Sequence, residues 1–320
     1  MIMLNSPETA PIWLIGSGEI ARAYADVLHS LEVSFVAIGR NPEKTIDFAS
    51  QYGADFFHGG LKAAIKSEVR PPEFAIVATD IANLSDCVEH LVEFGVSNIL
   101  VEKPFSLELN IAQEFVSGGS NIFVAFNRRF FASVTELKRR IKVEGGLRQI
   151  HFEISERIKD YQSPSQAVLT RKKWGVANSL HVIDLAQMLT GGMNLIGNAC
   201  AGRTSSGHKS LFAGSGECAH STGLVTYSGN WEGVGRWGIS VDTVSHRYEL
   251  LPLEELYVLS GDFLSRERIE CVDSGPFKHG FKEQVLAFLF NQEDSSLCTF
   301  SDFKKTLRLT YQIFGYEAQT

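Results

Sequence analysis

The stretch Trp13-Leu14-Ile15-Gly16-Ser17-Gly18-Glu19-Ile20-Ala21 decides the fold expected for this chain. An apolar run stops at Gly16, and the spacing Gly16-x-Gly18-x-x-Ala21 fits the fingerprint of a strand-to-helix turn that binds a dinucleotide. Gly16 permits a tight turn, Gly18 lets the backbone approach a pyrophosphate, and Ala21 allows close packing of helix on strand. The N–H groups and positive dipole end of the helix would face the phosphates. We predict cofactor contacts at Gly16, Ser17, Gly18, Glu19 and Ile20, the alternative being a plain turn between strand and helix.

The end of the next predicted strand indicates which cofactor is preferred. An NAD-selective site usually has an acidic residue there, which accepts hydrogen bonds from the ribose 2′-hydroxyl. This chain has Gly39 at about that place, followed by Arg40. A missing carboxylate removes repulsion of a 2′-phosphate, and a guanidinium can pair with that phosphate or stack on the adenine. The sequence favours NADP(H). NAD(H) remains the alternative if Arg40 only stacks, and Arg40 can also be a solvated turn residue.

A second stretch, Ile99-Leu100-Val101-Glu102-Lys103-Pro104, couples an apolar strand to a lysine followed by proline. Lys103 is expected just beyond the carboxyl end of a parallel strand, where ligands of such sheets bind. Pro104 fixes the backbone after it. Oxidation of an alcohol by hydride transfer also needs an acceptor for the hydroxyl proton. We predict that Lys103 is this catalytic group and touches both cofactor and substrate. Glu102 is expected to hold the nicotinamide ribose or to steady Lys103, and a solvated surface lysine is the alternative.

Strand and helix patterns alternate over the first 120 residues, which predicts a doubly wound parallel sheet of the Rossmann type. Expected strands are Ile12–Ile15, Val33–Ile38, Asp55–Phe57, Phe74–Ala78, Asn98–Val101 and Asn121–Ala125. Expected helices are Ile20–His29, Glu43–Gln51, Leu61–Lys66, Leu84–Phe94 and Leu109–Ser117. The predicted domains are 1–120, which binds the dinucleotide, and 121–320, which binds substrate and forms oligomers, with C-terminal helices able to pack back on the first.

Long strand-like runs dominate after about Gly145, which predicts an α+β domain with a large, mainly antiparallel sheet. Expected strands are Leu147–Ile158, Cys218–Thr226, Val234–Val241, His246–Leu251 and Leu256–Ser260. Expected helices are Ala132–Val143, Asn178–Leu189, Phe281–Phe290 and Asp302–Gln312. The fold class is therefore α/β, with an α+β second domain.

Composition excludes several classes of protein. The 30 Lys and Arg against 37 Asp and Glu give a net charge of −7, which implies no basic face for nucleic acid. No apolar run approaches the roughly 18 residues that span a bilayer, and the first residues lack a signal-peptide pattern. The 5 cysteines are scattered without a Cys-x-x-Cys pair. We expect a cytoplasmic protein with no membrane or nucleic-acid partner.

The motifs taken in order resemble those of the glucose-fructose oxidoreductase / inositol dehydrogenase / MocA family, the Gfo/Idh/MocA family. The resemblance covers most of the chain and rests on Gly16-x-Gly18-x-x-Ala21, Val77-Ala78-Thr79, Glu102-Lys103-Pro104, Asn127-x-Arg129-Phe130 and His181-x-x-Asp184. It implies a Rossmann domain, with Thr79 at the cofactor, followed by an open-faced sheet domain. It also implies NAD(P)-dependent oxidoreduction of sugars, cyclitols and related carbonyl compounds, and a homo-oligomer, dimer or tetramer, formed through the sheet.

Two positions depart from the family's pattern. Asp80 stands where members often have proline, and Ala177 stands where many have an aspartate four residues before the motif histidine. That aspartate is frequently catalytic or close to a metal. Its loss leaves Lys103 and His181 as the main catalytic candidates and, since no Cys/His cluster replaces it, we predict no metal.

The motif helix supplies the remaining substrate-site candidates. The i, i+3 spacing of His181 and Asp184 puts both on one helix face, so His181 can bond a substrate hydroxyl or share proton transfer while Asp184 orients its ring. The alternative is a histidine that only packs the helix. Asn178 reaches the substrate or caps the helix. Asn127 and Arg129 are expected to line the same cleft, where Arg129 binds an anionic group or ties the domains together.

These residues predict an oxidoreductase that moves a hydride between a nicotinamide cofactor and a sugar, sugar-derivative or cyclitol carbon. The expected partner is a small carbohydrate-like substrate. The alternative is a non-catalytic NAD(P)-binding regulator or sensor, because some relatives have lost activity. Glu102-Lys103-Pro104 favours the enzyme, and Ala177 favours the regulator.

Overall fold

The computed structural model of the chain describes residues 11–67, 70–111, 119–157, 168–204, 208–260 and 265–317. The chain forms two compact units. The first comprises Met1–Ser106, Asn110–Phe126 and Ser274–Phe300, and the second comprises Leu107–Leu109, Asn127–Asp273 and Ser301–Thr320. The main division thus follows Phe126 rather than residue 120, and the first unit also includes a segment near the C-terminus.

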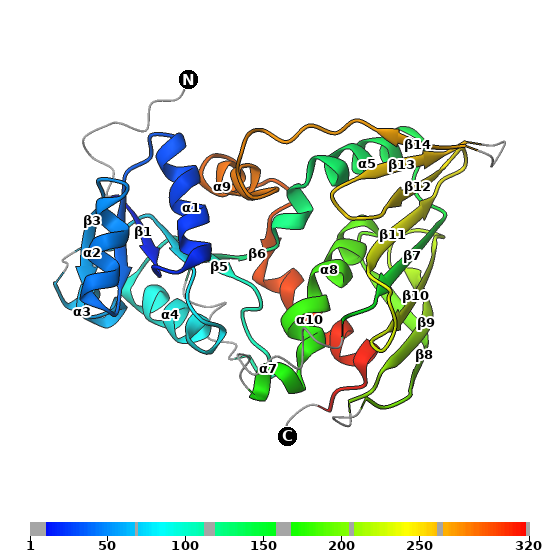
Figure 1. Cartoon of the computed structure of the whole chain (residues 1–320), viewed down its shortest axis with the longest axis horizontal. Helices are drawn as coiled ribbons and strands as arrows, with labels where there is room; N and C mark the ends of the chain where they lie inside the picture. Colours follow the sequence, from blue (N-terminus) through cyan, green and yellow to red (C-terminus); the bar gives the residue numbers. More distant parts are fainter. Residues whose placement is uncertain are drawn as a thin grey trace. The chain divides into compact units, whose positions relative to one another are not determined.

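The first unit is built on a seven-stranded sheet A with the order β15-β6-β5-β4-β1-β2-β3 (Figure 1). Its strands are β1 (Ile12–Ile15), β2 (Phe35–Gly39), β3 (Asp55–His58), β4 (Phe74–Val77), β5 (Asn98–Glu102), β6 (Asn121–Ala125) and β15 (Cys298–Thr299). Strands β1 to β6 are parallel, and β15 runs antiparallel to β6. The order reverses between β1 and β4, which is where ligands of doubly wound sheets bind. The predicted Rossmann-type sheet is confirmed.

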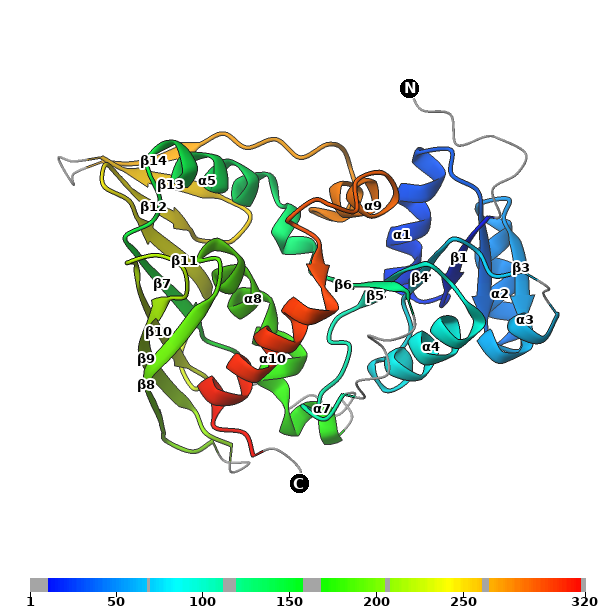
Figure 2. The same cartoon turned by 180° about the vertical axis from the view of Figure 1, so that it is seen from behind.

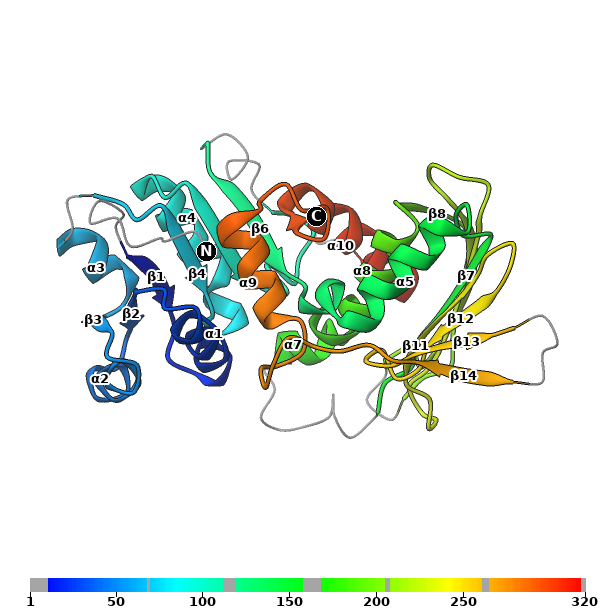
Figure 3. The same cartoon turned by 90° about the horizontal axis from the view of Figure 1, so that it is seen from above.

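Helices cover both faces of sheet A (Figure 3). One face carries α1 (Glu19–Ser30), α2 (Pro42–Ser50) and α9 (Phe281–Phe290), and the other carries α3 (Leu61–Ser67) and α4 (Ile81–Phe94). Helix α9 lies beside α1 in the views from front and back (Figures 1 and 2), because the Phe281 and Tyr24 rings pack with centroids 4.9 Å apart. Farther along α9, Phe288 packs against Phe74 and Phe123 of the sheet. The 274–300 segment therefore belongs to the core of the first unit.

The second unit is built on an eight-stranded sheet B with the order β14-β13-β12-β11-β7-β10-β9-β8. Its strands are β7 (Gln149–Ile154), β8 (Met193–Ala201), β9 (Leu211–Cys218), β10 (Leu224–Asn230), β11 (Trp237–Asp242), β12 (Arg247–Leu250), β13 (Leu256–Leu259) and β14 (Arg266–Ile269). All neighbours pair antiparallel except β10 and β7, so the mainly antiparallel sheet is confirmed.

One face of sheet B is covered by helices α5 (Ala132–Val143), α8 (Leu180–Leu189) and α10 (Phe300–Phe314) (Figure 3). In β7, Ile150, Phe152 and Ile154 are buried, while His151 and Glu153 between them are partly exposed. This period of two is that of a strand with only one face packed against the core. A sheet that packs helices on one face only is the open-faced sheet that the sequence resemblance implies.

Several expected elements differ from those observed. Strands β8, β9, β14 and β15 were not expected, and the strand expected at Cys218–Thr226 instead spans the turn between β9 and β10. The helix expected from Asn178 begins as a π-helix at Gly175–Ser179 that continues into α8. Most of the helix expected at Leu109–Ser117 lies outside the described residues. Within the described ranges, no helix is both long and apolar enough to cross a membrane.

Candidate functional site

The turn between β1 and α1 shows why glycine is needed there. Gly16 has φ +124°, and a Cβ on it would lie 2.2 Å from the Ala78 carbonyl oxygen. Its N–H donates to the Ile38 carbonyl at 2.9 Å, and the Ala78 N–H donates to the Ile15 carbonyl at 2.8 Å. A Cβ on Gly18, in contrast, would meet no protein atom within 4 Å. The carboxyl ends of β1, β2 and β4 are therefore tied together, while the space in front of α1 stays open.

A cavity of about 660 Å³ lies over these strand ends. It is within the range of about 300–1,000 Å³ typical of small-molecule sites. All predicted cofactor contacts except Glu102 and Lys103 line it, namely Gly16, Ser17, Gly18, Glu19, Ile20, Arg40 and Thr79. The first N–H groups of α1 have no partner within their own helix and can bind an anion. The open space at Gly18, the helix start and the cavity together fit a dinucleotide.

The wall at the end of β2 has no room for an acidic side chain. A Cβ on Gly39 would lie 2.1 Å from Thr45 Oγ1. The Thr45 hydroxyl is fixed in turn, because it donates to the Asn41 carbonyl at 2.6 Å at the start of α2. The fold itself therefore excludes, at this position, the carboxylate by which NAD-selective sites hold the ribose.

Arg40 has a partner that sequence reasoning did not assign. Its Nη2 lies 3.4 Å from Asp80 Oδ2, and the two side chains are 74% and 80% exposed. Asp80 occupies the position before α4 but makes no side-chain capping bond to that helix. Both residues line the 660 Å³ cavity, so a 2′-phosphate at Arg40 would compete with the Asp80 carboxylate.

Glu102, at the end of β5, is held by a buried network in the same unit. The Tyr24 hydroxyl donates to Glu102 Oε1 at 2.7 Å, and the Lys103 N–H donates to Glu102 Oε2 at 3.3 Å. The Tyr24 hydroxyl also lies 3.5 Å from the side-chain oxygen of buried Gln284 on α9. Burial raises the pKa of Glu102, against the lowering effect of Tyr24 and of the charges of Lys103 and Lys278. This geometry favours steadying of Lys103 as the role of Glu102.

In the second unit, Arg129 and Asp184 form a buried ion pair. Arg129 Nε and Nη2 donate to the two carboxylate oxygens of Asp184 at 2.7 and 2.6 Å, and the side chains are 4% and 1% exposed. Thr306 of α10 donates to the same carboxylate at 3.5 Å. Burial raises the pKa of Asp184 and the guanidinium counteracts it. Asn127, which begins the same short 3₁₀ turn as Arg129, is also buried. The pair joins the Asn127–Phe130 turn to α8 and α10, which favours an internal role over contact with a substrate.

His181 is buried at the start of α8 and packs on an aromatic neighbour. Its ring centroid lies 6.1 Å from that of Trp237, whose Nε1 donates to Glu156 Oε1 at 3.1 Å. The same carboxylate accepts from Asn178 Nδ2 at 2.9 Å and from the Ser179 hydroxyl at 2.5 Å. Burial raises the pKa of Glu156, against the effect of these donors. Glu156 thus fixes both the π-helix before His181 and the indole that His181 contacts.

Sequence reasoning missed the residues that support these groups. Tyr24 has the spacing of an ordinary core residue of α1, and only the structure shows that its hydroxyl reaches Glu102. Glu156 gave no signal either, because it lies within the strand expected at Leu147–Ile158 and near a second acid, Glu153. The peptide bond before Pro104 is cis. Among the described residues, no group of three or more His, Cys, Asp and Glu side chains could hold a metal ion.

A comparison with protein-family profiles matches the N-terminal third of the chain. A profile described as the oxidoreductase family Gfo/Idh/MocA, NAD-binding Rossmann fold, matches residues 11–117. A comparison with curated protein sequences finds no match. The family resemblance drawn from the sequence motifs is confirmed.

Solved structures share the fold over nearly the whole chain. UDP-N-acetylglucosamine 3-dehydrogenase from Acidithiobacillus ferrooxidans is 13% identical, with 95% of this chain and 96% of that chain covered and a TM-score of 0.72. A dehydrogenase from Chromobacterium violaceum is 15% identical, with 98% and 96% covered and a TM-score of 0.78. An oxidoreductase from Agrobacterium radiobacter, solved with NAD⁺, L-tartaric acid and magnesium, is 15% identical, with 94% of each chain covered and a TM-score of 0.71. At these identities the likeness establishes the fold.

Proposed function

This chain carries the NAD-binding Rossmann domain of the Gfo/Idh/MocA oxidoreductase family, and from that premise we propose that it is an NADP(H)-preferring oxidoreductase. It transfers a hydride between the nicotinamide and a carbon of a sugar, sugar derivative or cyclitol. The observation that carries the proposal is the 660 Å³ cavity over the ends of β1, β2 and β4, with Arg40 in its wall. The similar dehydrogenase of a nucleotide sugar supports the carbohydrate class of substrate.

The proposed chemistry assigns one task to each group. The nicotinamide, when bound, gives or takes the hydride. Lys103 takes the hydroxyl proton during oxidation and returns it during reduction. Glu102 steadies Lys103 through its backbone N–H and is itself fixed by Tyr24. In the second unit, His181 binds a substrate hydroxyl or relays the proton, and Trp237 supports its ring.

We also propose that the chain forms a homo-oligomer through the face of sheet B opposite the helices. The Arg129–Asp184 pair and Asn178 then act as positioning groups, because Arg129 and Asp184 bond to each other and Asn178 donates to Glu156, all within the second unit. The 5 free cysteines fit a reducing compartment such as the cytoplasm.

A second candidate function is a cofactor-binding regulator without catalysis. Ala177 favours it, because no acid precedes His181 at the usual spacing. The regulator and the enzyme share the cofactor cavity and differ only in turnover, so cofactor binding alone does not separate them.

The experiment that separates them is a substrate screen with purified protein. Sugars, nucleotide sugars and cyclitols are mixed with NADP⁺ or NAD⁺, and formation of reduced cofactor is followed by absorbance. The enzyme proposal expects turnover that Lys103→Met abolishes, which excludes a contaminant. Cofactor binding without turnover by any member of the panel would favour the regulator, and absence of binding would overturn both.

Cofactor preference gives a quantitative prediction. We expect wild-type protein to bind NADPH about tenfold more tightly than NADH, the lower end of what a charge-assisted hydrogen bond contributes, because Asp80 competes for Arg40. Arg40→Ala should remove the preference by weakening NADPH alone. Asp80→Asn should tighten NADPH by roughly two- to fivefold, the size of an exposed ion pair, and leave NADH unchanged. Fluorescence titration measures all three. Equal affinities in the wild type would refute the assignment of Arg40.

A further inference from the structure

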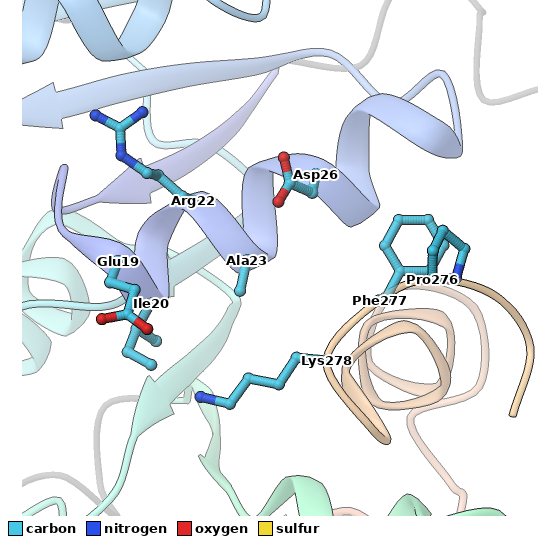
Figure 4. Close-up of a pocket in the computed structure, with 8 residues that line it drawn as sticks. All are labelled: Glu19, Ile20, Arg22, Ala23, Asp26, Pro276, Phe277 and Lys278. Atoms are coloured by element: carbon cyan, nitrogen blue, oxygen red, sulfur yellow. The ribbon is translucent and has the colours of Figure 1, made fainter.

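A second, smaller cavity of about 300 Å³ lies along the first turns of α1 (Figure 4). Its wall on the α1 side is formed by Glu19, Ile20, Arg22, Ala23 and Asp26. The opposite wall is Pro276–Lys278, which leads into α9. Both walls belong to the first unit, so this cavity is a feature of one compact body.

The small cavity adjoins the cofactor cavity at the N-terminal end of α1. Glu19 and Ile20 line both of them. Lys278 extends from its segment toward this shared edge, and its ammonium is the end of the side chain nearest Glu19 and Ile20 (Figure 4). The ammonium of Lys278, a residue some 260 positions after the glycine turn, thus faces the start of α1.

Lys278 also acts on the end of β5. Its charge lowers the pKa of Glu102, as does that of Lys103. Its Nζ lies 5.0 Å from the centroid of the Phe281 ring, which supports the extended stem. The ammonium therefore faces the first turn of α1 and is close enough to Glu102 for its charge to act on that carboxylate.

A dinucleotide in this unit must pass the same place. Its adenosine half lies on the side of Arg40, at the end of β2, and its pyrophosphate lies at the start of α1. Its nicotinamide half must then run toward the end of β5, where Lys103 stands. Because Glu19 and Ile20 line both cavities, a cofactor that ran from the start of α1 toward the end of β5 would pass them. A cation at this edge offsets the negative charge of Glu19 and of the phosphates.

We propose that Lys278 is a cofactor-binding residue whose ammonium pairs with the pyrophosphate on the nicotinamide side. The inference rests on the proposed cofactor binding but adds a residue from the C-terminal segment. It also gives that segment a function, because the return of residues 274–300 to the first unit completes the site. Lys278 would hold NADP(H) and NAD(H) equally, since it lies away from the 2′-position that Arg40 faces.

The test uses the full chain and four probes: NADPH, NADH, ADP-ribose and 2′-AMP. ADP-ribose has the pyrophosphate without nicotinamide or 2′-phosphate, and 2′-AMP has the 2′-phosphate without pyrophosphate. Lys278→Met should weaken NADPH, NADH and ADP-ribose by a common factor of about five to ten, between the values for an exposed ion pair and a desolvated charge-assisted bond. It should leave 2′-AMP unchanged. Lys278→Arg should restore most of the affinity.

The matched control is Lys282→Met, one turn farther along. Lys282 donates to the Ser274 carbonyl and does not line the cavity, so its loss should change none of the four affinities. Arg40→Ala should show the opposite pattern to Lys278→Met, weakening NADPH and 2′-AMP only. Equal loss of 2′-AMP in Lys278→Met, or equal losses in Lys278→Met and Lys282→Met, would overturn the inference. If the wild type binds neither NADPH nor NADH, the proposed function fails instead, and ADP-ribose still tests Lys278.

Discussion

Lys103→Met should lower turnover of the carbohydrate substrate by about a hundredfold or more, since general acid–base groups typically contribute about 10² to 10⁴ in rate. Methionine keeps much of the volume of the side chain but carries no proton. Glu102 should stay in place, because the substitution keeps the backbone N–H of residue 103 and the Tyr24 hydroxyl, which both donate to its carboxylate. Cofactor affinity should therefore change little. Steady-state kinetics and fluorescence titration on the same preparation measure the two quantities separately.

Lys103→Arg is the control for charge. A guanidinium keeps the positive charge but does not give up its proton near neutral pH, so it should be nearly as inactive as methionine if proton transfer is the task. Recovery of activity in Lys103→Arg would mean that Lys103 only supplies charge. Near-wild-type turnover in Lys103→Met would make the lysine structural.

His181→Ala tests whether the two candidates serve one step. Alone it should cost about tenfold in turnover and raise the substrate KM. In the double variant with Lys103→Met, turnover should fall little below that of Lys103→Met alone, because losses within one catalytic unit are not additive. Losses that multiply would show that Lys103 and His181 act on separate steps, even if both matter.

The sequence locates the glycine turn and the strand ends that line the 660 Å³ cavity, because local geometry decides both. Gly16 adopts a positive φ, and a Cβ on it would lie 2.2 Å from the Ala78 carbonyl oxygen. The glycine in the motif and the tight turn in the structure therefore reflect the same steric requirement. The end of β2 is similar, since Thr45 fills the space beside Gly39. Such constraints act within a few residues or across adjacent strands, and a spacing pattern records them.

The supporting residues depend on contacts that no local pattern records. Tyr24 meets Glu102 across 78 positions, and Gln284 lies 260 positions from Tyr24. A tyrosine at a buried helical position has the same pattern whether or not its hydroxyl has a partner. The partner of Arg40 shows the same limit, because Asp80 was noticed as a departure from the family pattern while its ion pair was not.

Strands β8 and β9 were missed for a different reason. The burial of β8 does not alternate cleanly, and its register with β9 shifts between Leu195 and Gly197. A shift of this kind breaks the period of two by which a strand is identified. The helix expected from Asn178 is likewise preceded by a π-helix at Gly175–Ser179. Hydrogen bonds in a π-helix join residues five apart rather than four, so the residue spacing of an α-helix does not reveal this first part.

Asp184→Asn should lower the free energy of unfolding of the second unit by about 3–5 kcal/mol, the usual cost of removing one partner from a buried ion pair. Arg129 is 4% exposed in its side chain and stays charged at any accessible pH. Loss of the carboxylate charge therefore leaves a buried guanidinium without its counter-ion. Urea unfolding followed by tryptophan fluorescence measures the change, because three of the 4 tryptophans, Trp174, Trp231 and Trp237, lie in the second unit.

Two controls distinguish the cost of leaving a buried charge unpaired from the cost of breaking an ion pair. Glu136→Gln breaks a partly exposed ion network with Arg139 and Arg140 on α5 and should cost no more than about 1 kcal/mol. Replacing both members of the buried pair, as in Arg129→Met with Asp184→Leu, should cost much less than Asp184→Asn, because no unpaired charge remains.

The same variants decide between the two roles that the sequence left open for Asp184 and Arg129. If the pair only ties the Asn127–Phe130 turn to α8 and α10, the apolar double variant should keep its substrate KM wherever it stays folded. A folded double variant with wild-type stability and a substrate KM raised tenfold or more would instead show that the pair contacts the substrate. We expect the internal role, because the two guanidinium nitrogens that bond Asp184 do so at 2.7 and 2.6 Å and the two side chains are only 4% and 1% exposed.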